Sequence, residues 1–335
     1  MSPSHERVRA GIAGATGYAG QELVRLLARH PFARVAAAMS SGSSDAPKRI
    51  PALARLWDGV VSPLDVEWLA RETDVVFLAL PEAVVPNVAR PLVEAGVRVI
   101  DLSGAFRIRD AADRARWYPA SAESAFGATY GLTEHHRNAI RDAKLVACPG
   151  CYPTAALLAI GPLVRSGLLA GEDVVIDAKS GISGAGKAAT EKTHFSECGE
   201  SVAAYGVFGH RHGIEIEQEL GMPVTFVPHL VPLNRGILET IYTRVKPGIT
   251  SGDVARVMDE AYRDAPFVRL TGEALPEIKH VAYTNFCDIG WQLDQASGRL
   301  ITVACLDNLL KGAAGQAIQN FNVAFGFDEC AGLLN

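Results

Sequence analysis

The first 150 residues alternate short apolar runs with helical patterns. Apolar runs occupy residues 7–13, 34–39, 74–80, 97–102 and 144–147, and helical patterns occupy residues 21–30 and 86–95. Short runs that are apolar throughout are typical of strands buried on both faces of a parallel sheet. Strands that alternate with helices in this way predict an α/β fold with a doubly wound parallel sheet of the Rossmann type.

The pattern changes after residue 150. An apolar helix is predicted at residues 155–160, and longer strands are predicted at 173–178, 224–227, 236–245 and 300–305. Longer alternating strands with fewer crossovers favour an α+β domain with an antiparallel or mixed sheet. The last predicted helix, 312–325, is apolar and rich in Gly and Ala, and we expect it to return to the first domain. The predicted domains are therefore 1–150 with 306–335, and 151–305.

Composition excludes several classes of protein. The 335 residues are 48% hydrophobic, which is enough for a packed core in one large or two medium domains. The net charge of −5 is spread along the chain without a basic stripe, which argues against a nucleic-acid binder. No apolar run approaches the roughly 18 residues of a membrane span, and residues 1–7 lack the pattern of a signal peptide. We therefore expect a cytoplasmic protein that binds neither membranes nor nucleic acid.

Three glycines lie between the first predicted strand and the first predicted helix. Gly14, Gly17 and Gly20 would let the backbone approach the pyrophosphate of a dinucleotide, which rests on the helix N-terminus. The spacing differs from Gly-x-Gly-x-x-Gly, and the same residues also fit an ordinary glycine-rich turn. Because the strand, loop, helix and second strand are all present, we predict a dinucleotide site that includes Thr16 and Tyr18.

The end of the second predicted strand bears on the choice of cofactor. An acidic residue there would hold the ribose 2′-hydroxyl of NAD and repel the 2′-phosphate of NADP. The strand instead runs into Ser40 and Ser41, and Lys48 and Arg49 follow. We therefore predict NADP(H) as the cofactor, with Ser40 and Ser41 among its contacts, whereas Lys48 and Arg49 fit a solvated loop equally well.

Cys151 lies where the strand that ends at residue 147 meets the apolar helix. In Pro149-Gly150-Cys151-Tyr152-Pro153 the thiol falls close to a helix N-terminus, where backbone N–H groups carry partial positive charge. A thiol held there loses its proton more easily, and the thiolate is the nucleophile. The local sequence fits a buried, helix-capping thiol equally well.

Cys148 and Cys151 also form a Cys-x-x-Cys pair. Zinc normally needs a second such pair or two histidines at ligand spacing, and the adjacent His135 and His136 rarely face one ion. We therefore predict no metal site. A disulfide framework is uncommon in a large cytosolic chain.

Three further segments carry acid–base or anion-binding groups. In His210-Arg211-His212 both imidazoles would face the same side of an extended segment, and either could exchange protons near pH 7. A metal pair or two surface histidines fit that spacing as well. Residues 180–187 fit either a nest of N–H groups for an anion or a flexible turn. Arg107 follows the strand 97–102 and is a candidate clamp for a carboxylate or phosphate, with a surface arginine as the alternative.

Taken together, these segments resemble the N-acetyl-γ-glutamyl-phosphate reductase family, which is related in fold to aspartate-semialdehyde dehydrogenase. The run Pro149-Gly-Cys-Tyr-Pro-Thr154 is the most specific of the matches. The matching segments follow the family's order along nearly the whole chain: 14–23, 101–107, 149–155, 180–186, 210–212, 235–240 and 307–314.

The resemblance implies an enzyme of arginine biosynthesis that uses NADPH to reduce N-acetyl-γ-glutamyl phosphate to N-acetylglutamate 5-semialdehyde and phosphate. It implies that Cys151 forms a thioester with this small acyl phosphate. His212 is then the expected acid/base, with His210 as the alternative or as an orienting partner. Arg107 is expected to bind the anionic substrate or the leaving phosphate.

The resemblance also assigns roles to the two domains. The first would bind NADP(H), and the second would carry catalysis and association into a homodimer or homotetramer. Ser180, Gly181 and Asn308 are expected on the cofactor side of the site.

Three other functions stay open from the sequence. A related reductase would act on an aminoadipyl phosphate in lysine biosynthesis and differ mainly in the residues that contact substrate. A thiol hydrolase would use Cys151 and a histidine without a nicotinamide cofactor. A regulator that senses NADP would need neither residue for its activity.

Overall fold

The computed structural model describes residues 7–42, 47–121, 126–171 and 173–334. The chain divides into two compact units: unit 1 contains Met1–Pro149 and Ala313–Asn335, and unit 2 contains Gly150–Gly312. Residues 1–6, in which the sequence predicts no signal peptide, lie outside the described residues. None of the helices in the described part of the chain is long and apolar enough to cross a membrane.

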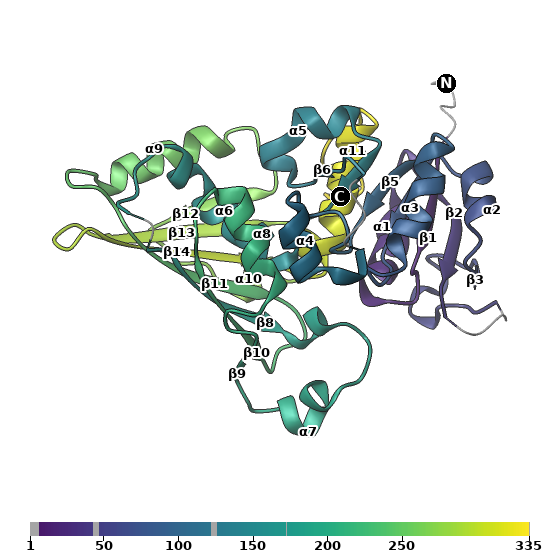
Figure 1. The fold of residues 1–335 in the computed structure, drawn as a ribbon, viewed down its shortest axis with the longest axis horizontal. Helices are drawn as coiled ribbons and strands as arrows, with labels where there is room; N and C mark the ends of the chain where they lie inside the picture. The colour runs from purple at the N-terminus through teal and green to yellow at the C-terminus, as the bar shows by residue number, and fades with distance from the viewer. Residues whose placement is uncertain (1–6, 43–46, 122–125, 172, 335) are drawn as a thin grey trace. The chain divides into compact units, whose positions relative to one another are not determined.

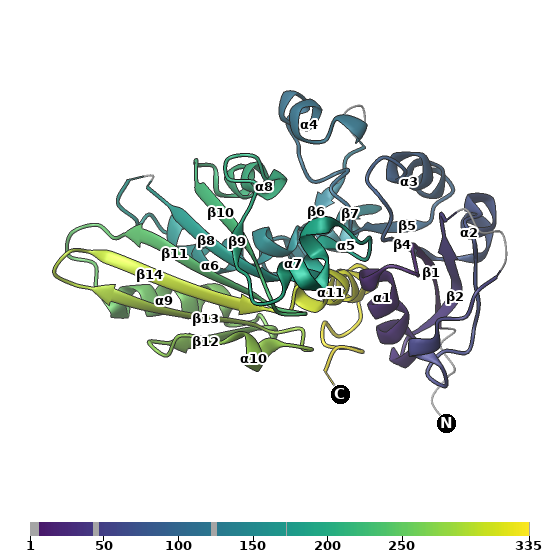
Figure 2. The ribbon, with the colours of Figure 1, turned by 90° about the horizontal axis from the view of Figure 1, so that it is seen from below.

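Unit 1 is a parallel sheet of seven strands with helices on both faces (Figures 1 and 2). The strand order is β3-β2-β1-β4-β5-β7-β6, and each neighbouring pair is parallel. The strands are β1 (Val8–Ala13), β2 (Ala33–Ser40), β3 (Val61–Pro63), β4 (Val75–Leu78), β5 (Arg98–Asp101), β6 (Thr129–Tyr130) and β7 (Leu145–Ala147). The helices are α1 (Tyr18–Arg29), α2 (Val66–Glu72), α3 (Val85–Glu94), α4 (Ala111–Trp117), α5 (Thr133–Asp142) and α11 (Gly315–Ala324), with short 3₁₀ turns η1 (Pro51–Leu53) and η2 (Pro119–Ser121). The doubly wound sheet predicted from the sequence is confirmed.

Apolar side chains fill both faces of this sheet. Successive residues of β4 alternate between two cores, because side chains of a strand point to opposite faces. Leu23 of α1 and Phe321 of α11 are fully buried in one core, and Leu69 of α2 and Leu92 of α3 are fully buried in the other. Helix α11 packs against α1 and α5, as the apolar pattern at the end of the chain predicts.

Unit 2 is a mixed sheet of seven strands in the order β12-β13-β14-β11-β8-β10-β9. Strands β8 and β10 are parallel, as are β12 and β13, and the other four pairs are antiparallel. The strands are β8 (Val175–Gly181), β9 (Ala203–Ala204), β10 (Thr225–Val231), β11 (Ile237–Arg244), β12 (Val268–Gly272), β13 (Cys287–Asp294) and β14 (Arg299–Leu306). The helices are α6 (Cys151–Arg165), α7 (Phe195–Cys198), α8 (Arg211–Leu220), α9 (Ser251–Tyr262) and α10 (Ile278–Val281), with 3₁₀ turns η3 (Ile182–Ala185) and η4 (Glu191–Thr193). The mixed sheet expected for the second domain is confirmed.

Helix α6 is the central helix of unit 2. Twelve consecutive residues, 152–163, are buried, which is expected of a helix covered on most sides. It packs on β11 and β14 and against α8 and α9, and Figure 1 shows α6 and α9 beside the long strands. One face of β11 is fully buried at Ile237 and Ile241, whereas the alternate residues are partly exposed. After β14 the chain forms a π-helical turn, η5 (Leu310–Ala314), before α11 begins.

Candidate active site

Cys151 is the first residue of α6, and Gly150 is its N-cap. Among the described residues no side chain caps this N-terminus, and the first turn contains no acidic residue. The positive end of the helix dipole therefore acts on the thiol, which favours the thiolate. Cys151 is partly exposed, whereas Tyr152 and Thr154 behind it are buried. The predicted position at a helix N-terminus is confirmed.

The imidazole of His212 packs directly on the residue before the cysteine. A Cβ atom at Gly150 would overlap His212 Nε2, so only glycine leaves room for this ring. The expectation of an extended segment is wrong here, because α8 begins at Arg211 and His210 is its N-cap. His210 Nδ1 accepts the backbone N–H of His212 at 3.1 Å, and the two ring centroids lie 4.7 Å apart. A helix start therefore brings the two rings together.

His210 is held in its neutral form. Burial, together with a smaller effect of the positive charge of Arg211, lowers the pKa of His210 to about 4. Nδ1 can accept the N–H of His212 only while it carries no proton. His210 therefore suits a capping role near pH 7, whereas proton transfer calls for an imidazole that changes its charge there.

Two tyrosine hydroxyls lie near the sulfur. Tyr152 and Tyr205 have their hydroxyl oxygens 3.3 Å apart. Burial raises the pKa of both hydroxyls, and negative charge on Cys151 contributes to each shift. Both groups therefore stay protonated and can donate hydrogen bonds. Tyr205, His210 and Arg211 also line a cavity of about 680 Å³ in unit 2.

Glu215 is a residue of this site that the sequence analysis missed. Its side chain is fully buried on α8, one turn after His212, and Oε1 accepts the N–H of Gly150 at 2.8 Å. The bond ties α8 to the first turn of α6. The spacing His212-x-x-Glu215 on a helix was the available signal, because residues three apart share a helix face.

The turn after β14 reaches Cys151 from another part of the chain. A Cβ atom at Gly312 would lie 2.8 Å from Cβ of Cys151, so the backbone of this turn rests on Cys151. Asn308 is 2% exposed; its Oδ1 accepts the N–H of Gly236 at 2.7 Å and its Nδ2 donates to Ser183 Oγ at 3.0 Å. The side chain of Asn308 therefore holds the turn, and a contact with the cofactor stays a prediction.

Ser180 and Gly181 end strand β8 in the same unit. Ser180 is 2% exposed, and its hydroxyl donates to the carbonyl of Gly181 at 3.0 Å. A Cβ atom at Gly181 would lie 2.8 Å from the carbonyl oxygen of Asn234, so this position requires glycine. Both residues are buried at the end of the strand that leads into η3, and their predicted role toward a cofactor is untested.

The three glycines of unit 1 differ in what they do. Gly14 has φ of +97°, and a Cβ atom there would overlap the carbonyl oxygen of Ala79. A Cβ atom at Gly20 would overlap the carbonyl oxygen of Gly14. At Gly17, the N-cap of α1, a Cβ atom would meet only the Gly14 carbonyl, at 3.6 Å, among the described residues. The fold therefore requires glycine at 14 and 20, while a Cβ atom at Gly17 would make only an ordinary van der Waals contact.

The other residues predicted to bind the cofactor lie around this loop. The N–H groups of Gly14 and Ala15 donate to the carbonyl of Met39 at 2.8 and 2.9 Å, which holds the loop beside the end of β2. Ser40 is the last residue of β2, and Ser41 follows it with an exposed side chain. At the start of α1, the Thr16 carbonyl accepts from Gln21 Nε2 at 2.9 Å, and Tyr18 is 39% exposed.

Arg107 lies in unit 1, where it is 8% exposed. Its Nε donates to the carbonyl of Cys148 and its Nη2 to the carbonyl of Leu102, both at 2.8 Å. The guanidinium thus braces the segments that follow β7 and β5. The predicted role of Arg107 as a clamp on the substrate stays a prediction.

Cys148 has different surroundings from Cys151. It is 1% exposed, Asn320 Nδ2 donates to its sulfur at 3.5 Å, and burial raises the pKa of its thiol to about 12. Cys148 therefore stays a thiol near pH 7. Within the described ranges, no group of three or more His, Cys, Asp or Glu side chains is arranged to hold a metal ion.

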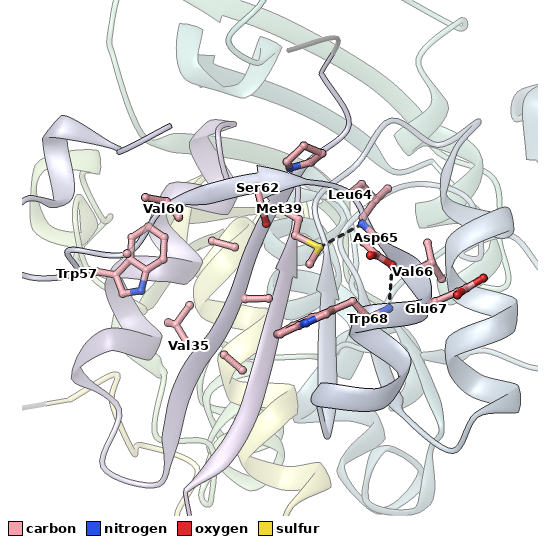
Figure 3. A pocket seen from close by; sticks show the side chains of 15 residues that line it. Val35, Met39, Trp57, Val60, Ser62, Leu64, Asp65, Val66, Glu67 and Trp68 are labelled. Carbon is pink, nitrogen blue, oxygen red and sulfur yellow. Dashed lines mark hydrogen bonds between the residues drawn. The ribbon is translucent and has the colours of Figure 1, made fainter. Parts of the chain in front are cut away.

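A second cavity, of about 890 Å³, lies on unit 1 between β2 and the segment around β3. Figure 3 shows Trp57 on one side of the view and Trp68 and Met39 on the other. Among the described residues that line this cavity, none is predicted to act in catalysis or to contact the cofactor.

Two family models match this chain, one within unit 1 and one within unit 2. Residues 9–143 match the family model "Semialdehyde dehydrogenase, NAD binding domain", and residues 151–308 match "Semialdehyde dehydrogenase, dimerisation domain". Among solved structures, aspartate semialdehyde dehydrogenase II from Vibrio cholerae, complexed with ASA, has a TM-score of 0.73 at 17% identity, covering 96% of this chain and 99% of that one. Aspartate semialdehyde dehydrogenase with NADP from Candida albicans has a TM-score of 0.69 at 18% identity, covering 95% and 98%. These structures share the fold.

Curated relatives are much closer in sequence. N-acetyl-gamma-glutamyl-phosphate reductase of Shouchella clausii is 45% identical over 337 residues, covering 97% of this chain and 98% of the relative. The reductase of the same name from Desulforapulum autotrophicum is 46% identical with the same coverage. The resemblance found in the sequence is therefore confirmed, and the chain belongs to the N-acetyl-gamma-glutamyl-phosphate reductase family.

Proposed function

We propose that the protein reduces N-acetyl-γ-glutamyl phosphate to N-acetylglutamate 5-semialdehyde with NADPH, through a thioester on Cys151, as a step of arginine biosynthesis. The observation that carries the proposal is a partly exposed thiol at the glycine-capped start of α6, with the His212 ring packed on the preceding residue. Membership of the reductase family supports the substrate.

The residues around Gly17 fit a dinucleotide. The start of α1 has a glycine N-cap and, among the described residues, no side-chain cap, and backbone N–H groups at a helix N-terminus bind phosphate. Ser40 and Ser41 offer hydroxyls and no negative charge at the end of β2, which suits a ribose 2′-phosphate and favours NADP(H) over NAD(H). When bound, the cofactor supplies a hydride.

Cys151 and His212 carry out the first half of the reaction. His212 takes the thiol proton, and the thiolate attacks the acyl carbon of the substrate. The carbon–sulfur bond forms as the bond from carbon to the phosphate oxygen breaks, and the leaving phosphate takes up the proton. Arg107 neutralises the charge of the substrate or the leaving phosphate.

The second half of the reaction regenerates free Cys151. Hydride addition at the thioester carbon leaves a thiohemiacetal oxyanion on Cys151. His212, which has taken up a proton from solvent after the phosphate left, donates that proton to the oxygen. The thiohemiacetal then collapses: His212 removes the hydroxyl proton, the carbon–sulfur bond breaks, and the semialdehyde leaves. Tyr152 and Tyr205, held protonated near the sulfur, donate hydrogen bonds to oxygen atoms of the substrate.

The two units take the two roles that the sequence predicts. Unit 1 binds NADP(H), and unit 2 carries Cys151 and associates with a second copy into a homodimer or homotetramer, in keeping with its match to a dimerisation domain. The cytoplasmic location expected from the sequence is part of the same proposal.

The assay that tests this function is phosphate-dependent reduction of NADP by N-acetylglutamate 5-semialdehyde. We expect activity that needs phosphate and is stronger with NADP than with NAD. The same assay with the aminoadipate semialdehyde homologue compares the substrate of lysine biosynthesis, and a higher kcat/KM for that homologue would contradict the proposal. Activity without phosphate or nicotinamide would indicate a hydrolase instead.

A further inference from the structure

A fully buried carboxylate, Asp307, organises the turn that rests on the nucleophile. Its Oδ1 accepts the backbone N–H groups of Leu309 and Leu310 at 2.8 and 3.0 Å. Its main-chain carbonyl accepts the N–H of Gly312 at 2.9 Å. The side chain and the backbone of one residue therefore fix the path of the chain as far as the glycine that contacts Cys151.

The other carboxylate oxygen anchors this turn to the rest of unit 2. Oδ2 of Asp307 accepts the N–H of Tyr283 at 2.7 Å and lies 3.5 Å from Nη1 of Arg235. Tyr283 has φ of +64°, a left-handed conformation that is costly for a side chain of this size, and the conformation directs its N–H to the carboxylate. The guanidinium of Arg235 lies 4.8 Å from the centre of the Tyr283 ring.

Two more side chains hold the same turn. Asn308 is bonded to Ser183 and Gly236, as described above. Lys311 is fully buried, with Nζ 5.8 Å from the ring centroid of Phe267. The segment is also a π-helical turn, a form found frequently at functional sites. A loop that only connected β14 to α11 would not need this many contacts.

The turn matters because of where it ends. A Cβ atom at Gly312 would lie 2.8 Å from Cβ and 3.3 Å from Cα of Cys151. The glycine backbone therefore covers one side of the cysteine and limits the directions in which the sulfur can point. A nucleophile must lie about 3 to 3.5 Å from its carbon in a defined direction, and a misplacement of about 1 Å costs up to 100-fold in rate.

We propose that Asp307 is a positioning residue for the nucleophile: it holds the turn 308–312 so that Gly312 fixes the orientation of the Cys151 thiolate. The proposal rests on the proposed role of Cys151.

Asp307→Asn tests the proposal. The amide keeps the size of the side chain but places an NH₂ group against backbone N–H donors, so the turn loses part of its anchorage. We expect kcat to fall about 10- to 100-fold, with KM for both substrates within about twofold of the wild type. Gly312→Ala, whose new methyl group presses on Cys151, should lower kcat in the same way while Asp307 stays intact.

Asp288→Asn is the matched control. Asp288 is a buried carboxylate on β13, the strand paired with β14, and it accepts hydrogen bonds from Nε and Nη2 of Arg269 at 2.6 and 2.8 Å. The Asp288→Asn variant should have a lower melting temperature, as Asp307→Asn does. Its kcat per folded molecule should stay close to that of the wild type.

Alkylation of Cys151 by iodoacetamide, followed against pH, separates position from ionisation and needs no substrate. For Asp307→Asn we expect the alkylation rate to have the same pH midpoint as in the wild type, although kcat is reduced. The proposal is overturned if Asp307→Asn and Asp288→Asn lose the same kcat, or if a shifted midpoint accounts for the whole loss. Should Asp307→Asn fail to fold, Gly312→Ala decides, because wild-type kcat in that variant contradicts the proposal. Failure of the proposed function itself would show separately, as activity in Cys151→Ala.

Discussion

Helices α1 and α6 begin in the same way, although the proposed function gives them different chemistry. Each follows a strand of unit 1, and each has a glycine N-cap in an extended conformation, Gly17 at φ −72° and Gly150 at φ −64°. Neither has an acidic residue in its first turn, and the part of the chain that the structure describes places no side-chain cap on either one. Both helices therefore present a positive N-terminus.

The two starts differ in what lies in front of the glycine. Among the described residues, a Cβ atom at Gly17 would meet only the carbonyl of Gly14, at 3.6 Å. Gly150, by contrast, is covered by the ring of His212 and bonded to Glu215, and Gly312 rests on Cys151. An open N-terminus suits an anion that arrives from solution, such as a cofactor phosphate. A surrounded N-terminus suits an anion that belongs to the chain, such as a thiolate. The neighbours, rather than the turn itself, decide which anion a helix start stabilises.

The largest expected effect comes from removing the thiol of Cys151. Cys151→Ala should lower kcat by about 10⁴-fold or more and leave the Kd for NADP unchanged, since the cofactor contacts proposed for the start of α1 remain. Steady-state rates and fluorescence titration measure the two quantities. Cys148→Ala is the control: its thiol is buried with a pKa of about 12, so kcat should stay within about threefold. A Cys151→Ala enzyme within about tenfold of the wild type would rule out covalent catalysis.

The second effect separates the two histidines. His212→Gln should lower kcat by about 100-fold or more, as expected for loss of an acid–base group. His210→Gln should cost less, because His210 acts as a neutral cap. Rates measured from pH 5 to 9 provide the check. Equal losses in the two variants would contradict the assignment of His212.

Glu215 tests whether the start of α6 depends on its neighbours. Glu215→Ala removes the acceptor of the Gly150 N–H and should lower kcat about 10-fold, with a loss of about 2 kcal/mol in the free energy of unfolding. Glu215→Gln keeps an acceptor oxygen and should recover most of both. The comparison uses initial rates and urea unfolding. Recovery of stability without recovery of kcat would mean that the charge, and not the bond, matters.

Gly17 tests the start of α1. Gly17→Ala adds a methyl group that makes only an ordinary contact, with the Gly14 carbonyl, at a negative φ, so the melting temperature should hold while the Kd for NADP weakens about 10-fold. Gly14→Ala is the contrast: φ is +97° and the methyl group overlaps Ala79, so the free energy of unfolding should fall by about 2 kcal/mol or more. Unchanged NADP affinity in Gly17→Ala would remove the evidence for a phosphate at this position.

The smallest effect is a pH dependence of stability. The pKa of His210 falls from 6.5 to about 4 on folding, so the unfolded chain binds the proton more readily. The stability that this difference contributes is complete above pH 6.5 and is lost as the pH falls through 4. His210→Gln should therefore show a weaker dependence of the melting temperature on pH between 6.5 and 4. An identical dependence would mean that His210 is not held neutral by burial.

Local patterns predicted most of the fold and part of the site. Three features depend only on residues that are neighbours in the sequence: the apolar run of β4, the glycines after β1 and the start of α6 near Cys151. Hydrophobic periodicity and turn chemistry therefore predicted them. The start of α8 was missed because His210-Arg211-His212 carries no strong cap signal. Gly312 could not be found, because its contact with Cys151 joins distant parts of the chain. Glu215 shares a helix face with His212, but its bond to Gly150, 65 positions away, could not be predicted from that spacing. Asp307 likewise acts on Tyr283 and Arg235 only through the packing of unit 2.

The most direct test of the account mixes the enzyme with N-acetyl-γ-glutamyl phosphate in the absence of NADPH. We predict a burst of one phosphate per active site and a matching acyl group on the peptide that contains Cys151, found by mass spectrometry after acid quenching. Addition of NADPH should then discharge the acyl group as the semialdehyde. Phosphate release that requires NADPH, or an acyl group absent from Cys151, would contradict the central claim.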